Sequence, residues 1–180
     1  MKKKIMNEIE IPEGVEVTIN GNSVKVKGEN GEFEKKFNAS KLILEKKENN
    51  LIIGKEIATK NDKKRINTIK AHLKNMLKGA KEKFEYQLKV VSSHFPITVE
   101  VNGNTATIKN FLGEKIPRKV SIVDGCEVSI NKDLISIKSN SKESAGQTAA
   151  NFETATKIRM RDRRIFQDGI FLINKSGRKI

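Results

Sequence analysis

The chain has 180 residues and a formal net charge of +14, with 36 Lys and Arg against 22 Asp and Glu. This length suits one domain or two small ones, and the charge favours nucleic acid, ahead of an anionic membrane surface, as the partner. No apolar run approaches the ~20 residues of a membrane-spanning helix, and the single cysteine, Cys126, excludes an internal disulfide and fits a reducing cytosol.

In the first half of the chain, strand patterns come first. Val15, Val17 and Ile19 alternate with polar residues, and a hairpin turn signal at Asn20–Asn22 leads into a second alternating run. Further strands are predicted at residues 42–44 and 51–53.

A helix pattern closes this half. We predict its N-cap at Asn61 or Asp62 and its C-terminal stop at Gly79. The apolar residues at helical spacing are Ile66, Ile69, Leu73, Met76 and Ala80. Before the strands, Lys2–Lys4 is expected to be a disordered tail.

The second half repeats the first. Thr18–Lys27 is similar to Glu100–Lys109 at an offset of 82 residues (100 − 18), with Asn-Gly-Asn aligned on Asn-Gly-Asn. An offset of this size matches a small domain, so we predict two copies of one domain, residues 1–83 and 84–180. Strands are expected at 84–91, 98–101, 105–109, 118–123, 127–130 and 134–138, and a helix at about 141–157. The fold class is therefore α+β, each copy being a mostly antiparallel sheet packed with one helix.

Catalytic and metal-binding patterns are not found. His72 is expected on a helix surface, and His94 follows Ser92 and Ser93 without an oxyanion loop or a third partner. One cysteine and two distant histidines cannot supply a metal site, and no glycine-rich nucleotide loop occurs. We therefore expect no enzyme, no cofactor and no small-molecule substrate.

Arginine is concentrated near the C-terminus. Five of the seven arginines lie between Lys157 and Ile180, and residues 154–180 hold eight basic and two acidic residues. A guanidinium grips a phosphate at two points, so this segment favours a nucleic-acid contact; a solvated basic tail is the alternative. Apolar residues interleave with the charge, so we expect much of the segment to be docked: Ile165, Phe166, Ile170, Phe171, Leu172 and Ile173.

The candidate RNA-binding residues follow from this charge pattern. The main group is Lys157, Arg159, Arg161, Arg163, Arg164, Lys175, Arg178 and Lys179. Lys115 and Arg118, near Gly113, form a second group. In the first half the lysines are spread among glutamates. This diffuse charge is typical of a soluble surface, so we expect the first half to serve as a scaffold. With few aromatic residues at surface-like positions, the chain should favour folded, backbone-rich RNA over open strands.

Three segments resemble a known family, the large-subunit ribosomal protein six family in its archaeal and eukaryotic form: His94–Ile97, Asn110–Lys115 and Asp162–Phe171. The helix segment Gly146–Asn151 is also similar. The resemblance implies two copies of one α+β domain in a structural, cytoplasmic ribosomal protein.

The resemblance further implies that the second domain binds large-subunit ribosomal RNA near the sarcin–ricin region and the stalk base, beside neighbouring ribosomal proteins. From the residues alone, a free protein-interaction module, a non-ribosomal RNA-binding protein and an enzyme acting on RNA remain alternatives.

Overall fold

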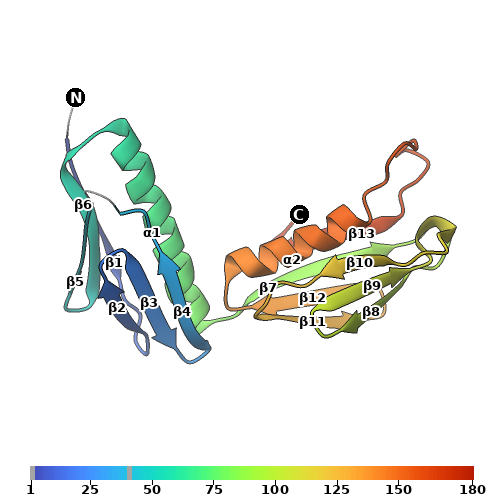
Figure 1. The fold of residues 1–180 in the computed structure, drawn as a ribbon, viewed down its shortest axis with the longest axis horizontal. Coiled ribbons are helices and arrows are strands. Elements are labelled where there is room, and N and C mark those ends of the chain that lie inside the picture. Colours follow the sequence, from blue (N-terminus) through green and yellow to red (C-terminus); the bar gives the residue numbers. More distant parts are fainter. Residues whose placement is uncertain (1–2, 40–41) are drawn as a thin grey trace. The chain divides into compact units, whose positions relative to one another are not determined.

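A computed structural model describes residues 3–39 and 42–180. They form two compact units, one ending at Lys83 and the other beginning at Phe84 (Figure 1). Each unit has its own hydrophobic core, built from antiparallel sheets and one helix. The predicted α+β fold with two tandem copies is confirmed. Within the described residues, no helix is long and apolar enough to cross a membrane.

The first unit holds two three-stranded sheets and helix α1 (Lys60–Lys81). One sheet has the order β1-β6-β5, from β1 (Lys3–Glu10), β6 (Asn50–Ala58) and β5 (Ile43–Lys47). The other has the order β2-β3-β4, from β2 (Glu16–Asn20), β3 (Ser23–Gly28) and β4 (Gly31–Lys36). Strand β1 was not predicted. Lys3 and Lys4 belong to it and are not a disordered tail, while Lys2 lies outside the described residues.

Both predicted ends of helix α1 are wrong. Thr59 is the N-cap, and its side chain accepts a hydrogen bond from the Asp62 backbone, while Asp62 accepts one from the Thr59 backbone at 3.0 Å. This reciprocal pair is a capping box. The sequence analysis placed the N-cap at Asn61 or Asp62, two or three residues too late. At the other end the helix runs past Gly79, because Asn30 of the first unit donates from its side-chain amide to the Lys81 carbonyl at 2.8 Å and supplies the terminal partner.

The second unit repeats this topology. Its three-stranded sheet has the order β10-β9-β8, from β10 (Arg118–Ser121), β9 (Thr105–Lys109) and β8 (Thr98–Asn102). Its larger sheet contains β11 (Cys126–Asn131), β12 (Leu134–Ser139) and β7 (Phe84–Val91), in the order that β5, β6 and β1 have in the first unit. A short 3-10 turn, η1 (Phe111–Gly113), connects β9 to β10.

The second unit then adds two strands beyond β7. Strand β13 (Gly169–Lys175) pairs antiparallel with β7, and β14 (Arg178–Lys179) pairs with β13. The C-terminal segment is therefore a loop followed by strands of the larger sheet, and not a solvated basic tail. The apolar run Ile170–Ile173 lacks the alternation that marks a half-buried strand, which is why periodicity missed it.

Helix α2 (Lys142–Ala155) covers this sheet through small residues. Ala145, Ala149 and Phe152 of this helix are buried in the core. The helix ends at Ala155, before the predicted Lys157. The C-cap Thr156 leaves the helical range with φ −99° and ψ 10°, and its hydroxyl accepts a hydrogen bond from the Ile170 backbone at 3.0 Å. The residues that follow leave the helix as the 156–168 loop (Figure 1).

We expect Phe152→Ala to destabilise the second unit alone. The side chain is fully buried in the second unit's core, and truncation of such a phenylalanine costs about 3–5 kcal/mol. Hydrogen exchange with peptide resolution, in increasing denaturant, measures each unit's free energy of unfolding. Gln147→Ala, at an exposed position of the same helix, is the control and should change neither unit. An equal loss in the first unit would contradict the picture of two separate cores.

Candidate nucleic-acid interface

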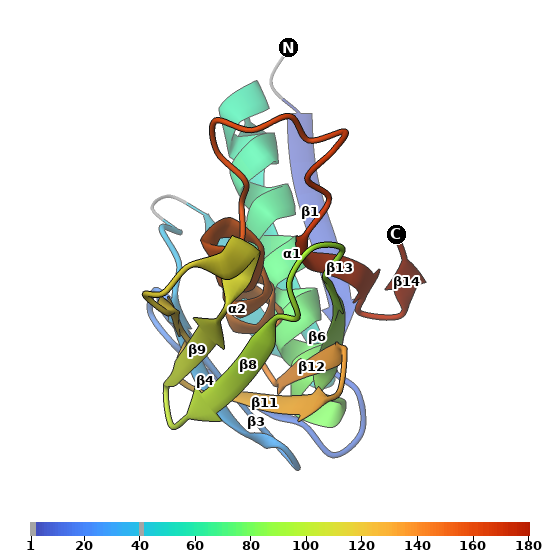
Figure 2. The ribbon, with the colours of Figure 1, turned by 90° about the vertical axis from the view of Figure 1, so that its right-hand side faces the viewer.

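Three loops meet at one end of the second unit: 92–97, 110–117 and 156–168 (Figure 2). We call this the three-loop end. Asn110 donates from its side-chain amide to the Pro96 carbonyl at 3.0 Å, and a Cβ placed on Gly113 would lie 3.4 Å from the Phe95 ring. Gly113 has a φ of +76°, a conformation that side chains disfavour, so glycine suits both the turn and the close ring.

Asp168 fastens the 156–168 loop to the 92–97 loop. Its carboxylate accepts hydrogen bonds from the backbone N–H groups of Ser93 and His94, the latter at 3.0 Å, and lies 2.6 Å from His94 Nδ1. The side chain is 1% exposed. Desolvation raises the pKa of Asp168, but these bonds to its charged form outweigh that effect and hold the pKa below its ordinary value.

Aromatic contacts extend this junction. The His94 and Phe166 rings are stacked with centroids 5.0 Å apart, and the Arg161 guanidinium lies 4.7 Å from the Phe166 centroid. An arginine held over an aromatic face is attracted by the ring quadrupole. Phe166 therefore connects the cationic part of the loop to His94.

Arg118 ties the 110–117 loop to the end of α2. Its guanidinium donates twice to Glu114, at 2.7 and 2.5 Å, and once to the Ala155 carbonyl at 2.6 Å. It also lies 4.3 Å from the centre of the buried Phe111 ring. The Arg118 bond lowers the pKa of Glu114. Three of the five guanidinium donors are occupied in this way, so Arg118 holds the 110–117 loop against the end of α2 and leaves two donors for a ligand.

The tip of the 156–168 loop is shaped by its own polar bonds. The carbonyl of Asp162 accepts from the backbone of Phe166 at 2.9 Å, and its carboxylate pairs with the Arg164 guanidinium at 2.8 Å. This pairing lowers the pKa of Asp162 and raises that of Arg164. Met160 and Ile165 are exposed at the tip. Of the six apolar residues expected to dock the segment, Ile170 is buried and Phe166, Leu172 and Ile173 are partly buried. The expectation is wrong for Ile165 and Phe171, which are exposed.

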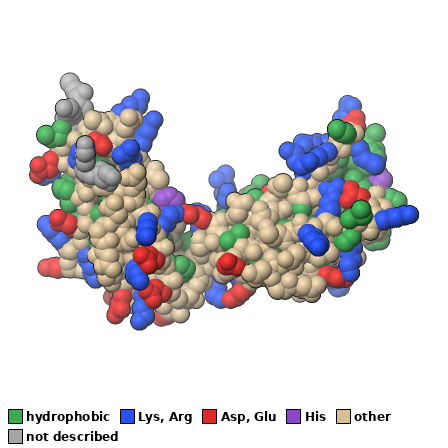
Figure 3. Space-filling model, viewed as in Figure 1, with side chains coloured by type: hydrophobic (Ala, Val, Ile, Leu, Met, Phe, Trp, Pro, Cys, Tyr) green, Lys and Arg blue, Asp and Glu red, His purple; other side chains and the backbone are tan. Residues whose placement is uncertain are grey.

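Most of the predicted cations gather at the three-loop end (Figure 3). Exposed on the 156–168 loop are Lys157, Arg159, Arg161, Arg163 and Arg164; Lys115 is exposed on the neighbouring loop. Lys175, Arg178 and Lys179 are not brought to this place. They lie at the far end of β13 and on β14, six residues along the strand from Gly169, or about 20 Å at the usual strand rise.

The sequence analysis did not identify His94, Asp168 and Phe166 as the residues that hold the 92–97 and 156–168 loops together. It considered Ser92, Ser93 and His94 without a third partner, and the structure supplies that partner in Asp168. Ser93 bonds the carboxylate through its backbone, and no described serine hydroxyl bonds the His94 ring, so this is a structural junction and not a nucleophilic triad. Among residues 3–39 and 42–180, no cluster of His, Cys, Asp or Glu is suited to a metal ion.

We expect Asp168→Asn to loosen the 156–168 loop while the sheets stay folded. The amide nitrogen would face N–H donors that now have a carboxylate acceptor, a loss of about 1–3 kcal/mol. Hydrogen exchange at the Ser93 and His94 amides should accelerate accordingly. Asp162→Asn is the matched control, because its ion pair is exposed and such pairs contribute little.

The pH dependence of this junction follows from the lowered pKa of Asp168. Its contribution to stability is complete above the ordinary value of 3.8 and is lost as pH falls through the lower folded-state value. The protection of the Ser93 and His94 amides, taken relative to the intrinsic exchange rate at each pH, should therefore fall below pH 3.8 in the unmodified chain, and Asp168→Asn should lose this dependence. An identical acid response in both proteins would show that Asp168 does not control the loop.

Comparison with known proteins agrees with this structure. The family profile described as Ribosomal protein L6 matches residues 11–83 and 95–169. The chain is 49% identical over 171 residues to the large ribosomal subunit protein uL6 of Methanobrevibacter smithii, covering 95% of this chain and 96% of that protein. It is 42% identical over 175 residues to uL6 of Methanothrix thermoacetophila, covering 97% and 99%. The three segments that carried the resemblance, which begin at His94, Asn110 and Asp162, meet at the three-loop end, and the chain belongs to the ribosomal protein L6 family.

Proposed function

We propose that this chain is a structural constituent of the large ribosomal subunit and binds ribosomal RNA mainly through the three-loop end of its second unit. Membership of the L6 family makes it a ribosomal protein and not an enzyme. Its place would be the cytoplasmic ribosome, and its partners ribosomal RNA and other ribosomal proteins.

The observation that carries this proposal is a set of unpaired cations on a fixed loop. The 156–168 loop has five Lys and Arg against two Asp, a net charge of +3. One of the two acids, Asp168, is buried in the junction with His94. Within the described part of the chain, the side chains of Lys157, Arg159 and Arg163 have no hydrogen bond or ion pair, so their donors are available for phosphate.

An ordered 156–168 loop favours RNA binding, because phosphate contacts position the protein on the RNA as well as adding affinity. Each of several long side chains loses rotamer freedom when it binds, and a loop that also had to become ordered would lose more. The Asp168 bonds and the Arg118 contacts remove most of that second loss before RNA arrives. The cations would then meet RNA as a shaped surface rather than a flexible tail.

The two units would have different roles, the first as a scaffold and the second as the RNA-binding unit. In the first unit, residues 1–83, lysines pair with nearby acids: Lys25 lies 3.4 Å from Glu34, and Lys55 lies 2.9 Å from Asp62. Such pairs leave a surface of mixed sign that suits a scaffold. In the second unit, residues 84–180, Lys175, Arg178 and Lys179 would form a separate contact on β13 and β14, and Lys115 would add to the three-loop end.

We further propose that this contact lies near the stalk base and the factor-binding region, beside the ribosomal proteins there. The resemblance of the His94, Asn110 and Asp162 segments to the L6 family supports this placement. Crosslinking from Arg159 and Arg163 in assembled subunits tests it: crosslinks to RNA of the sarcin–ricin and stalk-base regions are expected, and crosslinks to distant RNA would overturn it.

Replacing Arg159, Arg161, Arg163 and Arg164 together by Ser should weaken binding to large-subunit ribosomal RNA and flatten its salt dependence. Each phosphate contact adds about 0.7–0.9 to the slope of log affinity against log salt, so four lost contacts would reduce it by about 3. Filter binding across a salt series measures both quantities.

A matched loss of four charges in the first unit is the control for that experiment. Lys63, Lys64, Arg65 and Lys74 are exposed on α1, and their replacement by Ser should leave most of the affinity and slope intact. Equal effects of the two variants would show that total charge, and not the three-loop end, binds the RNA. If neither variant changed association with the subunit, the chain would bind through protein contacts instead.

A further inference from the structure

An apolar pocket and a cationic groove lie on the two sides of the segment that leaves α2. The pocket has a volume of about 600 Å³ and the groove about 570 Å³. Thr154, Lys157 and Ile158 line both, so they form the wall between them. Both belong to the second unit. The pocket has the size typical of a small-molecule site.

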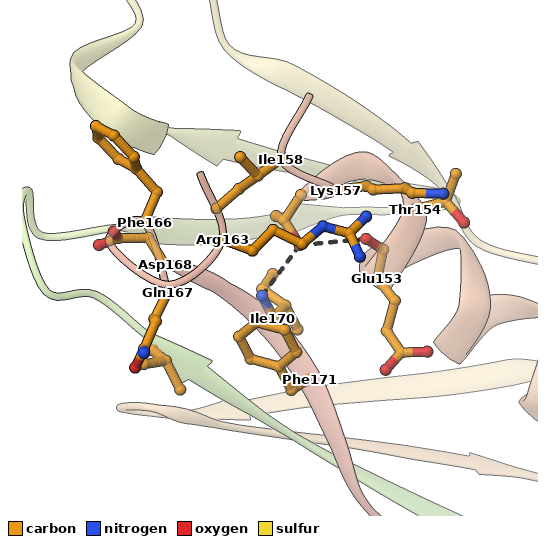
Figure 4. A pocket seen from close by; sticks show the side chains of 12 residues that line it. Glu153, Thr154, Lys157, Ile158, Arg163, Phe166, Gln167, Asp168, Ile170 and Phe171 are labelled. Carbon is orange, nitrogen blue, oxygen red and sulfur yellow. Dashed lines mark hydrogen bonds between the residues drawn. The ribbon is translucent and has the colours of Figure 1, made fainter. Parts of the chain in front are cut away.

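The pocket is lined mainly by hydrocarbon and a few polar groups (Figure 4). Ile158, Ile170 and Phe171 supply apolar and aromatic surface, and Arg163 stands at its rim. Glu153 also lines it; one of its carboxylate oxygens accepts from the Leu172 backbone at 3.0 Å, and the other has no hydrogen-bond partner among the described residues. A flat group with its own N–H donors would suit this combination.

The groove has the opposite character. Four cations line it besides Arg118: Lys119, Lys157, Arg159 and Arg161. Its one acid, Glu114, is neutralised by its bidentate pair with Arg118. The groove therefore has an excess of positive charge directly beside the apolar pocket. That charge suits an anion joined to the group in the pocket.

We propose that the three-loop end captures one unstacked nucleotide of its RNA, with the base in the pocket and the adjoining phosphates in the groove. This deepens the proposed function and rests on it. Unpaired bases splayed from loops and bulges are the usual points at which proteins recognise RNA specifically, by aromatic and guanidinium stacking. Glu153 would accept a hydrogen bond from a base amino group, as carboxylates do from cytosine.

This assignment changes the expected mode of binding. The scarcity of surface aromatics predicted a preference for folded, backbone-rich RNA over open strands. In the structure Phe171 is 46% exposed and Phe166 is partly buried, so aromatic surface is present where the cations gather. It also adds Lys119, which the sequence analysis did not single out, to the phosphate contacts.

The first arm of the test is a titration of the full chain, followed by amide NMR, with each of the four nucleoside 5′-monophosphates. We expect millimolar nucleotide to shift the amides of Ile158, Ile170 and Phe171, and AMP, GMP and CMP to act more strongly than UMP. Inorganic phosphate should shift groove residues such as Lys119 and Arg159 only. Pocket shifts with a capped phenylalanine peptide, and none with nucleotides, would assign the pocket to a protein side chain and overturn the proposal.

The second arm measures RNA binding by Phe171→Ala, with Leu134→Ala as the control. Leu134 is 44% exposed on β12 of the same sheet and is not part of the pocket, so the two truncations remove similar surface. Phe171→Ala should weaken binding to large-subunit ribosomal RNA about tenfold, the loss of one base contact, with no change in salt slope. Leu134→Ala should bind as the unmodified chain does.

The outcomes separate the two proposals. If the four-arginine variant loses affinity and salt slope while Phe171→Ala binds normally, the phosphate interface stands and the base pocket is wrong. If the four-arginine variant binds normally, the proposed function itself fails. Circular dichroism melting of Phe171→Ala and Leu134→Ala shows that both stay folded, and equal losses of affinity in both would also overturn the pocket.

Discussion

The buried carboxylate of Asp168 is the contact on which the three-loop end depends. It accepts from two consecutive backbone N–H groups and faces His94 Nδ1, across 74 residues of sequence. A carboxylate that is 1% exposed needs such partners, because an unsatisfied buried charge would be strongly destabilising. Satisfying Asp168 therefore fixes two loops at once. With His94 held in place, Phe166 stacks on its ring and Arg161 lies over Phe166. These contacts set the direction in which the 156–168 loop presents its cationic side chains.

The duplicated fold explains how this contact became possible in only one unit. Both units share the order of three strands in each sheet, but the second adds β13 beside β7. The added strand begins at Gly169, directly after Asp168, and pairs with Val91, directly before the 92–97 loop. Strand pairing brings the two loops together, and the carboxylate then joins them. The cationic loop is the connection that this extra strand requires between α2 and the sheet.

The sequence predicted much of the fold because its signals are local. Alternation and Asn-Gly turns located β8 and β9 and their counterparts in the first unit, and the Asn-Gly-Asn repeat showed the duplication. Strand β13 escaped detection because its apolar run has no alternation. The capping box was missed, because Asn61 or Asp62 was taken for the cap and Thr59 was not considered. Local sequence patterns therefore predicted the presence of most strands and helices, but not the residues at which the helices begin and end.

The candidate site was predicted less completely. Clustered arginines indicated the loop, but charge alone could not separate Lys157 and Arg163, which are free, from Arg118, which ties the 110–117 loop to the end of α2. Nor could it show that Lys175 and Arg178 lie elsewhere. Asp168 and His94 meet only through the pairing of β13 with β7, which is a tertiary event. Both residues lie in segments that resemble the L6 family. That resemblance identified the family, but it did not show that the two side chains are in contact.

Hydrogen exchange of the chain, measured free and bound to large-subunit ribosomal RNA, tests most directly whether the three-loop end is already ordered before it binds the RNA. In the free chain the Ser93 and His94 amides should already exchange slowly, because Asp168 accepts both. Binding should then protect residues 92–97, 111–119 and 156–168 while the first unit changes little. Fast exchange at Ser93 and His94 in the free chain, or protection confined to the first unit, would contradict this account.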